Sequence, residues 1–393
     1  MICCAFLLVT CMNNETVNTK PAEAEKVKYG QFAGSQACAN CHKNMYDSCM
    51  HTAHYLTSQP ASEKGIQGSF EQGKNTFVFN PAVSISMEKR DSHLFQVEYI
   101  NGVEKTSRPF DIVIGSGKRG QTFLYWDNNK LFQLPITYFT SAHQWSNSPG
   151  YSNKVKFNRP ITSRCLECHS TFFEKIPGPD NRQEAFSTSK IMYSVSCERC
   201  HGPGAAHVTF QLQHPEEKKA RYIINPATFT RQQNLDMCQL CHGGRLSKTQ
   251  PSFQFQSGDT LSRFFATDTA TKDISTIDVH GNQYGMLSAS KCFKMSNMTC
   301  GSCHSPHNNE TGNTALFSQR CMNCHKTGRN NFCKMAGKAG METIKKDCIS
   351  CHMPEQPSRA IMVLLQGQDT PTPALMRSHF IAIYPLAAGA VKR

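Results

Sequence analysis

Long hydrophobic runs are missing from this chain of 393 residues, and tryptophan occurs only twice. Hydrophobic residues make up 39% of the sequence. No segment reaches the ~20 apolar residues that a membrane-spanning helix needs, which argues against an integral membrane protein. For one or two domains of this length, the shortage of apolar side chains leaves a thin core. Some other apolar material is therefore expected inside the fold.

Runs of basic residues are also missing, although the formal net charge is +13 at pH 7. A nucleic-acid-binding surface gathers Lys and Arg into a patch or stripe, and no run of five basic residues occurs here. We therefore expect no nucleic-acid partner. Residues 115–120 spell G-x-G-x-x-G, but residues 121–126 resemble a strand and not the helix that a dinucleotide site requires. No nucleotide is expected either.

Cysteine, in contrast, is abundant. Of 20 cysteines, 14 belong to seven copies of Cys-x-x-Cys-His. In chain order, the motifs are Cys38-Cys41-His42, Cys165-Cys168-His169, Cys197-Cys200-His201, Cys238-Cys241-His242, Cys300-Cys303-His304, Cys321-Cys324-His325 and Cys348-Cys351-His352. This pentapeptide is the attachment site of haem c: both thiols form thioethers to the porphyrin, and the histidine is the proximal iron ligand. We therefore expect seven covalent haems, whose porphyrins replace much of the side-chain core.

Two other uses of clustered cysteines fit less well. A structural zinc site surrounds one ion with two Cys-x-x-Cys pairs, and nothing in it explains a histidine that recurs at the next position. A disulfide scaffold suits a short secreted chain with varied spacings, not a long chain with one fixed spacing.

The haems also change the expected net charge of the protein. Seven ferric haems would each add about one negative charge, which lowers the expected net charge to about +6.

The N-terminus carries a short apolar segment that is too short to span a bilayer, and we interpret it as a signal peptide over residues 1–10. Leu8-Val9-Thr10-Cys11 resembles a bacterial lipobox, which predicts that Cys11 is lipidated; an ordinary cleaved signal is the alternative. Residues 11–34 then form a flexible tether. The sequence predicts an exported bacterial protein, anchored by lipid to a membrane, such as the outer membrane, and exposed on the periplasmic side.

The haem motifs divide the rest of the chain. Residues 35–67 hold the first motif, residues 68–142 hold none, and residues 143–393 form a six-haem domain. The middle segment is rich in aromatic and β-branched residues and contains hairpin turns at Asn101-Gly102 and Asp127-Asn128-Asn129. The expected fold is mainly α and irregular coil wrapped around seven c-type haems, with a small antiparallel β insertion at residues 68–142.

Nine histidines lie outside the motifs, and the sixth iron ligands are sought among them. His54, His207 and His307 each follow a motif too closely to reach round its haem, so we expect them to ligate a neighbouring haem. His143, His280 and His379 are further candidates, for which an ordinary loop or core histidine is the alternative. His51 is either a helix-face residue or a seventh ligand. One haem is therefore left open, or uses His51 or a methionine.

The segments around the motifs resemble a known superfamily. Cys197-Glu-Arg-Cys-His-Gly-Pro-Gly-Ala-Ala-His207, Cys300-Gly-Ser-Cys-His-Ser-Pro-His307 and Cys348-Ile-Ser-Cys-His-Met-Pro354 are similar to motifs of multihaem cytochromes. The group includes the tetrahaem cytochrome of nitrification, octahaem hydroxylamine oxidoreductase and pentahaem nitrite reductase. The resemblance implies stacked haems with mostly bis-histidine ligation. The Cys-x-x-Cys-Lys motif of the nitrite reductase is missing, so we assign no catalytic residue.

The resulting prediction is a heptahaem c-type cytochrome that transfers electrons between periplasmic or membrane redox partners. The alternative is an oxidoreductase that acts on a small nitrogen or sulfur compound at one haem with an open distal side. A third hypothesis makes the β insertion a docking module for a partner protein. Of the cysteines left over, Cys49, Cys292 and Cys333, we expect the last two to form a disulfide.

Overall fold

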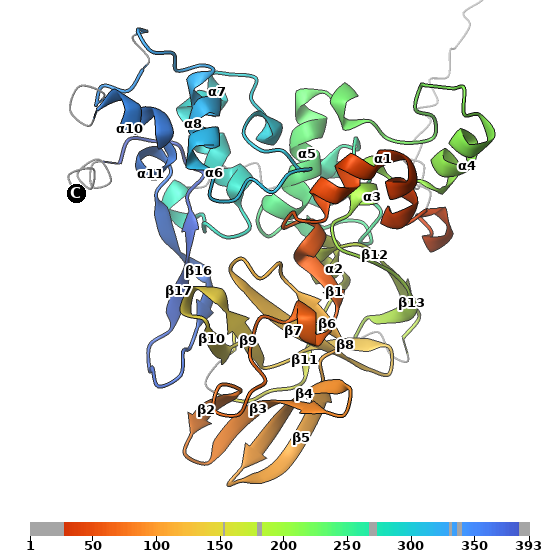
Figure 1. Ribbon diagram of the computed structural model, residues 1–393, viewed down its shortest axis with the longest axis vertical. Helices are drawn as coiled ribbons and strands as arrows, with labels where there is room; N and C mark the ends of the chain where they lie inside the picture. The colour runs from red at the N-terminus through yellow and green to blue at the C-terminus, as the bar shows by residue number, and fades with distance from the viewer. Residues whose placement is uncertain are drawn as a thin grey trace, which may run out of the picture.

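The computed structural model describes residues 27–151, 154–178, 183–266, 273–329, 332–335 and 340–384. Figure 1 shows two regions: most helices gather in one half of the molecule, and sheets fill the other half. About 30% of the structure is helical and 27% is strand. The expectation of a mainly α fold with one small β insertion is therefore wrong.

Two antiparallel sheets make up most of the strand-rich half. The seven-stranded sheet contains β1 (Ser58–Pro60), β6 (Ile112–Ile114), β7 (Gly120–Asp127), β8 (Lys130–Gln133), β9 (Ile136–Phe139), β10 (Gln144–Asn147) and β11 (Arg159–Pro160). The four-stranded sheet has the order β2 (Thr76–Asn80), β3 (Val83–Arg90), β4 (His93–Ile100) and β5 (Val103–Pro109). The strands expected from the aromatic and β-branched segments are thus present.

Strands β6 and β7 are buried on both faces, which explains their almost unbroken apolar sequence. Successive side chains of a strand point to opposite faces. Accordingly, Phe123 and Tyr125 lie in one core cluster with Val113, whereas Leu124 lies in a second cluster with Ile112. The second cluster also contains residues of α2 and β12, so the sheet connects the strand-rich half to the first helices of the haem-motif region.

An aromatic group lies at the centre of the first core cluster. The ring centres of Phe110 and Phe123 are 4.7 Å apart, and those of Phe123 and Trp145 are 5.7 Å apart. The Trp145 indole nitrogen donates a hydrogen bond to the Ser69 carbonyl at 2.9 Å. A Cβ atom at Gly68 would lie 2.1 Å from the Trp145 ring, so this close packing requires glycine.

The predicted hairpin turns are present. Asn101 and Gly102 have φ values of 51° and 76°, and Asn128 and Asn129 have 48° and 63°. Positive φ values at both central residues are typical of the type I′ turn, whose twist matches that of the two strands in a two-residue hairpin. The G-x-G-x-x-G segment, as expected, forms a turn between β6 and β7, and its last glycine begins a strand and not a helix.

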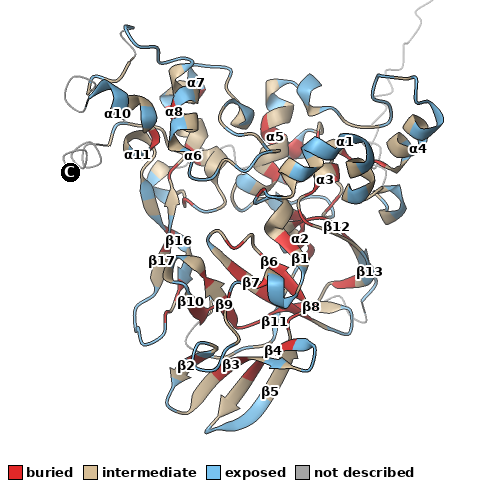
Figure 2. Cartoon of the chain, viewed as in Figure 1, coloured by how far each residue is buried: buried red, intermediate tan, exposed pale blue. Residues whose placement is uncertain are grey.

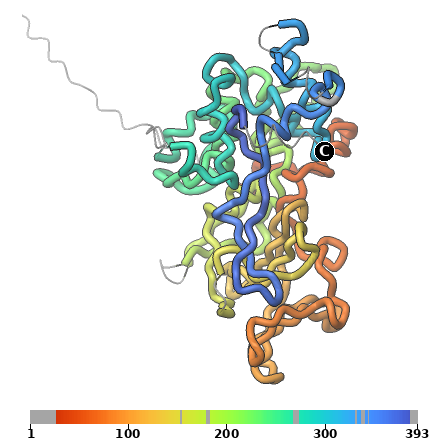
Figure 3. The backbone as a smooth tube through the Cα atoms, turned by 90° about the vertical axis from the view of Figure 1, so that its left-hand side faces the viewer, coloured from red at the N-terminus to blue at the C-terminus, as the bar shows by residue number. Residues whose placement is uncertain are grey.

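Three hairpins lie where only helix and coil were expected. They are β12 (Ser170–Ile176) with β13 (Ala185–Tyr193), β14 (Ser247–Lys248) with β15 (Phe265–Ala266), and β16 (Glu355–Val363) with β17 (Thr372–Arg377). Their apolar side chains explain the difference, because Phe172, Phe173 and Phe186 complete the second core cluster and Val363 and Ala374 are buried against Phe139. Figure 3 shows the β16–β17 hairpin, in blue, running lengthwise from the helical half along the strands.

The helices are short and bury little. They are α1 (Ser35–Cys49), α2 (Ser163–His169), α3 (Cys197–His201), α4 (Ala205–Gln213), α5 (Arg231–His242), α6 (Gln283–Ala289), α7 (Lys291–Lys294), α8 (Thr314–Met322), α10 (Met341–Lys346) and α11 (Ile349–His352). Helices α1 and α4 have no buried residue at all, and Figure 2 shows buried segments concentrated between α2 and the strands. Among the described residues, no helix combines the length and apolar character needed to cross a membrane.

The predicted signal peptide and the lipidation residue Cys11 lie outside the described residues. The described part of the predicted tether, residues 27–34, packs against the protein. Val27, Tyr29 and Phe32 contact the second core cluster, and the ring centre of Phe32 lies 5.2 Å from that of Phe172. A flexible tether, if present, therefore ends before Val27.

Replacement of Phe123 by alanine tests the importance of the aromatic group. Phe123 is fully buried, so the substitution should lower the free energy of unfolding by about 3–5 kcal/mol. Urea denaturation followed by near-ultraviolet circular dichroism measures this loss. Val103→Ala is the control, because Val103 is 57% exposed and its loss should change stability by less than about 0.5 kcal/mol. Equal stabilities of the two variants would contradict this description of the core.

Candidate haem-binding sites

All seven motifs begin or end in a helical element that arranges their side chains for one cofactor. The motif histidine is the last residue of α2, α3, α5 and α11. In a helix, residues three and four apart lie on the same face. The two thiols and the following imidazole therefore face one side of each helix turn, as covalent haem attachment requires.

Thiols of different motifs meet in pairs. The hydrogen-bonded pairs are Cys38 with Cys197, Cys168 with Cys241, Cys238 with Cys300, and Cys321 with Cys348. Within the first pair, the mutual hydrogen bond raises the pKa of Cys38 and lowers that of Cys197 to about 7. In the haem-bound protein these sulfur atoms would be thioethers, so the contacts mark where neighbouring porphyrins attach.

These contacts define an order for the motifs. Counting motifs along the chain, the hydrogen-bonded thiols connect the first to the third, the second to the fourth, the fourth to the fifth, and the sixth to the seventh. Electrostatic contacts add Cys200 with Cys238 and Cys303 with Cys324. The motifs therefore follow the order one, three, four, five, six, seven, and the second lies beside the fourth.

Three proximal histidines face a second histidine from a distant part of the chain. The ring centres lie 6.1 Å apart for His242 with His54, for His201 with His307, and for His304 with His379. A metal–imidazole bond is about 2 Å long and the ring centre lies roughly 1 Å behind the nitrogen, so two imidazoles on one iron have centres about 6 Å apart. The residues present therefore fit bis-histidine haem.

A fourth pair is indicated by electrostatics. Burial is the main cause that lowers the pKa of His169 to about 4, and the largest contribution from a charged group comes from His280. Burial is also the main cause that lowers the pKa values of His54 and His379 to about 4. These imidazoles are therefore neutral at pH 7, which is the form that binds a metal.

Hydrogen bonds at Nδ1 hold several of the histidine rings in a fixed orientation. Nδ1 lies 2.9 Å from the Ile224 carbonyl in His201 and 2.8 Å from the Ala382 carbonyl in His352. A ring that donates its Nδ1–H to a carbonyl presents Nε2 to a metal, and such partners orient ligating histidines. His207 has the same feature, with Nδ1 2.8 Å from the Arg221 carbonyl.

Other polar side chains also hold motif histidines. Thr57 Oγ1 lies 3.0 Å from Nδ1 of His169, and Gln283 Oε1 lies 3.1 Å from Nδ1 of His242. Sequence reasoning missed these supporting residues, because nothing in the motif spacing indicates which distant side chain will lie behind each ring.

The structure does not bring every predicted ligand to a motif. In the described part of the chain, the four pairs leave out the candidates His51, His143 and His207. His51 and His143 are exposed. The proximal histidines His42 and His352 belong to none of these four pairs. Their sixth ligands, and the role of the three candidates, stay predictions.

The expected disulfide does not form. Cys292 and Cys333 are both free thiols, because they lie beside different motifs: Cys292 is in electrostatic contact with Cys324, and Cys333 with Cys351. Cys49 is also free and lies near Cys197, and burial is the main cause that raises its pKa to about 11.

Comparison with known proteins found one similar family and one similar solved structure. Residues 135–202, which include the second and third motifs, match the model of the family described as cytochrome c554 and c-prime. Among solved structures, the chain is similar to the outer cell wall cytochrome OcwA, with a TM-score of 0.55 and 14% identity over 92% of this chain and 81% of that chain. No curated protein matches the sequence.

The motifs, the histidine geometry and the family match define the chain as a multihaem c-type cytochrome. Its cofactor is haem c. Membership of the wider superfamily that contains the nitrogen-cycle enzymes stays a prediction.

Substitution of His54 tests the crossed ligation. His54→Ala should remove the sixth ligand of the haem at the fourth motif, so that about one haem equivalent changes from low-spin to high-spin in the ferric protein. Low-temperature EPR with spin quantification measures the change. His93→Ala is the matched control, because His93 is an exposed histidine at the start of β4. An unchanged high-spin fraction in His54→Ala would show that His54 is not a ligand.

Proposed function

We propose that this protein is a heptahaem c-type cytochrome that conducts electrons between redox partner proteins. The observation that supports the proposal most strongly is the chain of contacts among the motif thiols, because haems attached at touching sulfur atoms lie close enough to exchange electrons. Each haem would supply an iron centre that changes between the ferric and ferrous states.

The protein's own residues hold and tune these centres. Paired thiols would attach each porphyrin to a short helical turn, and at three motifs a histidine from a second segment would supply the sixth iron ligand. An iron with two histidine ligands has no free position for a substrate, which suits electron transfer. Carbonyl groups behind Nδ1 keep the rings oriented.

The cellular setting is part of the proposal. Covalent haem attachment is typical of exported proteins, and the lipobox-like sequence at Leu8–Cys11 supports an anchor at the periplasmic side of a bacterial membrane. The partners in this proposal are a membrane or periplasmic electron donor and a second redox protein as acceptor.

The alternative function is an oxidoreductase that acts on a small nitrogen or sulfur compound at one haem. The position of His51 and His143 outside the histidine pairs favours it, because these are two of the seven candidate sixth ligands. An iron without a sixth protein ligand can bind a substrate.

EPR of the fully oxidised protein separates the two functions. The electron-transfer proposal predicts about seven low-spin ferric haems and no high-spin signal. Protein-film voltammetry should then show reversible current that does not grow when nitrite or hydroxylamine is added. About one high-spin haem together with a catalytic current would establish the alternative. A haem content clearly below seven per chain, from the pyridine haemochrome spectrum and intact mass, would refute the haem number.

A further inference from the structure

Glu198 is a buried acid inside the third haem motif, between Cys197 and Cys200. Its side chain is only 3% exposed. The carboxylate accepts three backbone hydrogen bonds: Oε1 accepts from Ala33 N at 2.8 Å and from Gly204 N at 2.7 Å, and Oε2 accepts from Gly34 N at 2.9 Å. These amides stand immediately before α1 and α4. One carboxylate therefore connects α3 to the beginnings of two other helices.

The two helix beginnings belong to segments that carry a haem motif and a candidate iron ligand. Helix α1 contains the first motif, and α4 contains His207 in its first turn. The chains approach closely here, since a Cβ atom on Gly204 would lie 3.8 Å from the Ala33 Cβ and 3.2 Å from Glu198 Oε1. His207 is held by Nδ1 at the Arg221 carbonyl, which leaves Nε2 for a metal.

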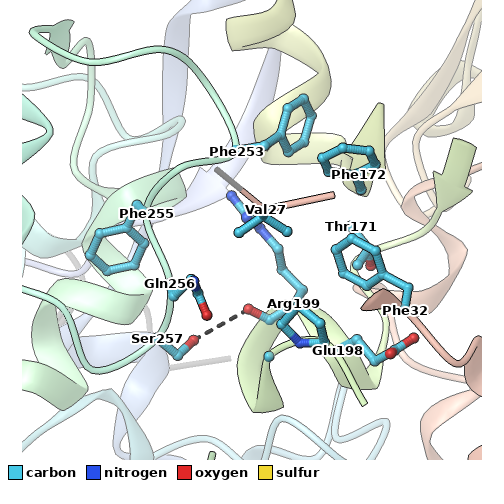
Figure 4. Close-up of a pocket in the computed structure, with 12 residues that line it drawn as sticks. Val27, Phe32, Thr171, Phe172, Glu198, Arg199, Phe253, Phe255, Gln256 and Ser257 are labelled. Carbon is cyan, nitrogen blue, oxygen red and sulfur yellow. Dashed lines mark hydrogen bonds between the residues drawn. The ribbon is translucent and has the colours of Figure 1, made fainter. Parts of the chain in front are cut away.

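The charge of Glu198 has no cationic partner among the described residues. The neighbouring Arg199 extends away from it: its guanidinium lies 5.7 Å from the Phe253 ring centre and donates to the Glu167 carbonyl at 3.0 Å (Figure 4). Glu167, the buried acid of the second motif, is by contrast paired with Arg164 at 3.1 Å. The cavity beside Glu198 holds about 20 Å³, room for about one water molecule, so bulk solvent does not screen the charge.

We propose that Glu198 is a potential-setting residue: its buried charge lowers the reduction potentials of the haems at the first and third motifs. Reduction adds an electron to a haem, and a nearby buried anion disfavours that added charge. Glu198 is in electrostatic contact with the thiols of both motifs, Cys38 and Cys197. The inference rests on haem binding at these motifs, which is part of the proposed function.

Two substitutions separate the charge of Glu198 from its hydrogen bonds. In Glu198→Gln, the amide oxygen can still accept from Ala33 and Gly204, but the amide NH2 group cannot accept from Gly34, so the charge and one hydrogen bond are lost. The reduction equilibrium constants of about two haems should then rise on the order of tenfold, and the low-spin count should stay unchanged. In Glu198→Ala, the charge and all three hydrogen bonds are lost. The same rise should appear, because it follows from the charge.

The matched control is Glu216→Gln, which removes an acid from the segment after α4 whose side chain is 74% exposed. Solvent screens this charge, so the potentials should stay as in the wild type. The measurements are spectroelectrochemical titration and EPR spin quantification of each purified holoprotein, with haem content measured in parallel. If Glu198→Ala assembles fewer haems than the wild type, Glu198→Gln still decides the inference.

One result would overturn the inference. Titration curves of Glu198→Gln that superimpose on the wild type would show that the carboxylate is only a structural cap. The titration needs no redox partner. A protein that shows the expected shifts but reduces no partner would therefore refute the electron-transfer function and leave the role of Glu198 intact.

Discussion

Histidine pairs that bridge distant segments are the constraint on which the helical half of the molecule depends. His54 precedes the β insertion and meets His242 far beyond it, and His304 meets His379 near the end of the described chain. Helix α1, which carries the first motif, and helix α4 bury no residue, so side-chain packing alone cannot hold them in place. In the proposed holoprotein, iron and porphyrin connect these segments, so folding of this half is coupled to cofactor binding.

The strand-rich half, in contrast, is held together by side-chain packing. Its sheets have two conventional cores, with fully buried Phe123 on one face of β7 and Leu124 on the other. Because successive side chains of β6 and β7 point to opposite faces, these two strands contribute residues to both cores. This half can therefore specify its own structure, and it supplies a rigid base for the helical half through α2 and β12, which join the second core.

The sequence predicted those parts of the structure that local patterns determine. Spacing alone identified the seven motifs, and limited reach predicted that His54 and His307 would cross to other motifs; the structure places them beside His242 and His201. The turn residues and aromatic segments likewise predicted strands β2, β4, β6, β7 and β8, whereas β3 and β5 were not predicted. These features depend on residues that are close in the chain.

Features that depend on distant contacts were not predictable. The β12–β13 and β16–β17 hairpins gain stability from core clusters assembled by other segments, so their local sequences looked like coil. Nothing in the spacing of Cys292 and Cys333 shows that each lies beside a different motif. The position of Glu198 inside a Cys-x-x-Cys pair was visible, but its contact with the amides before two other helices was not.

The β insertion also explains why the order of the motifs in space differs from their order in the chain. It separates the first and second motifs in sequence, and the second motif stays at its surface: Leu166 of α2 packs in the same core cluster as Ile112 and Leu124. The first motif instead meets the third. Arg164 then ties α2 to α5 by donating to the Leu240 carbonyl at 2.6 Å. The second motif is therefore a side branch at the fourth, the only such branch among the contacts described, and it faces the sheets. A cytochrome with this arrangement has three ends at which electrons can enter or leave, and one of them lies against the strand-rich half.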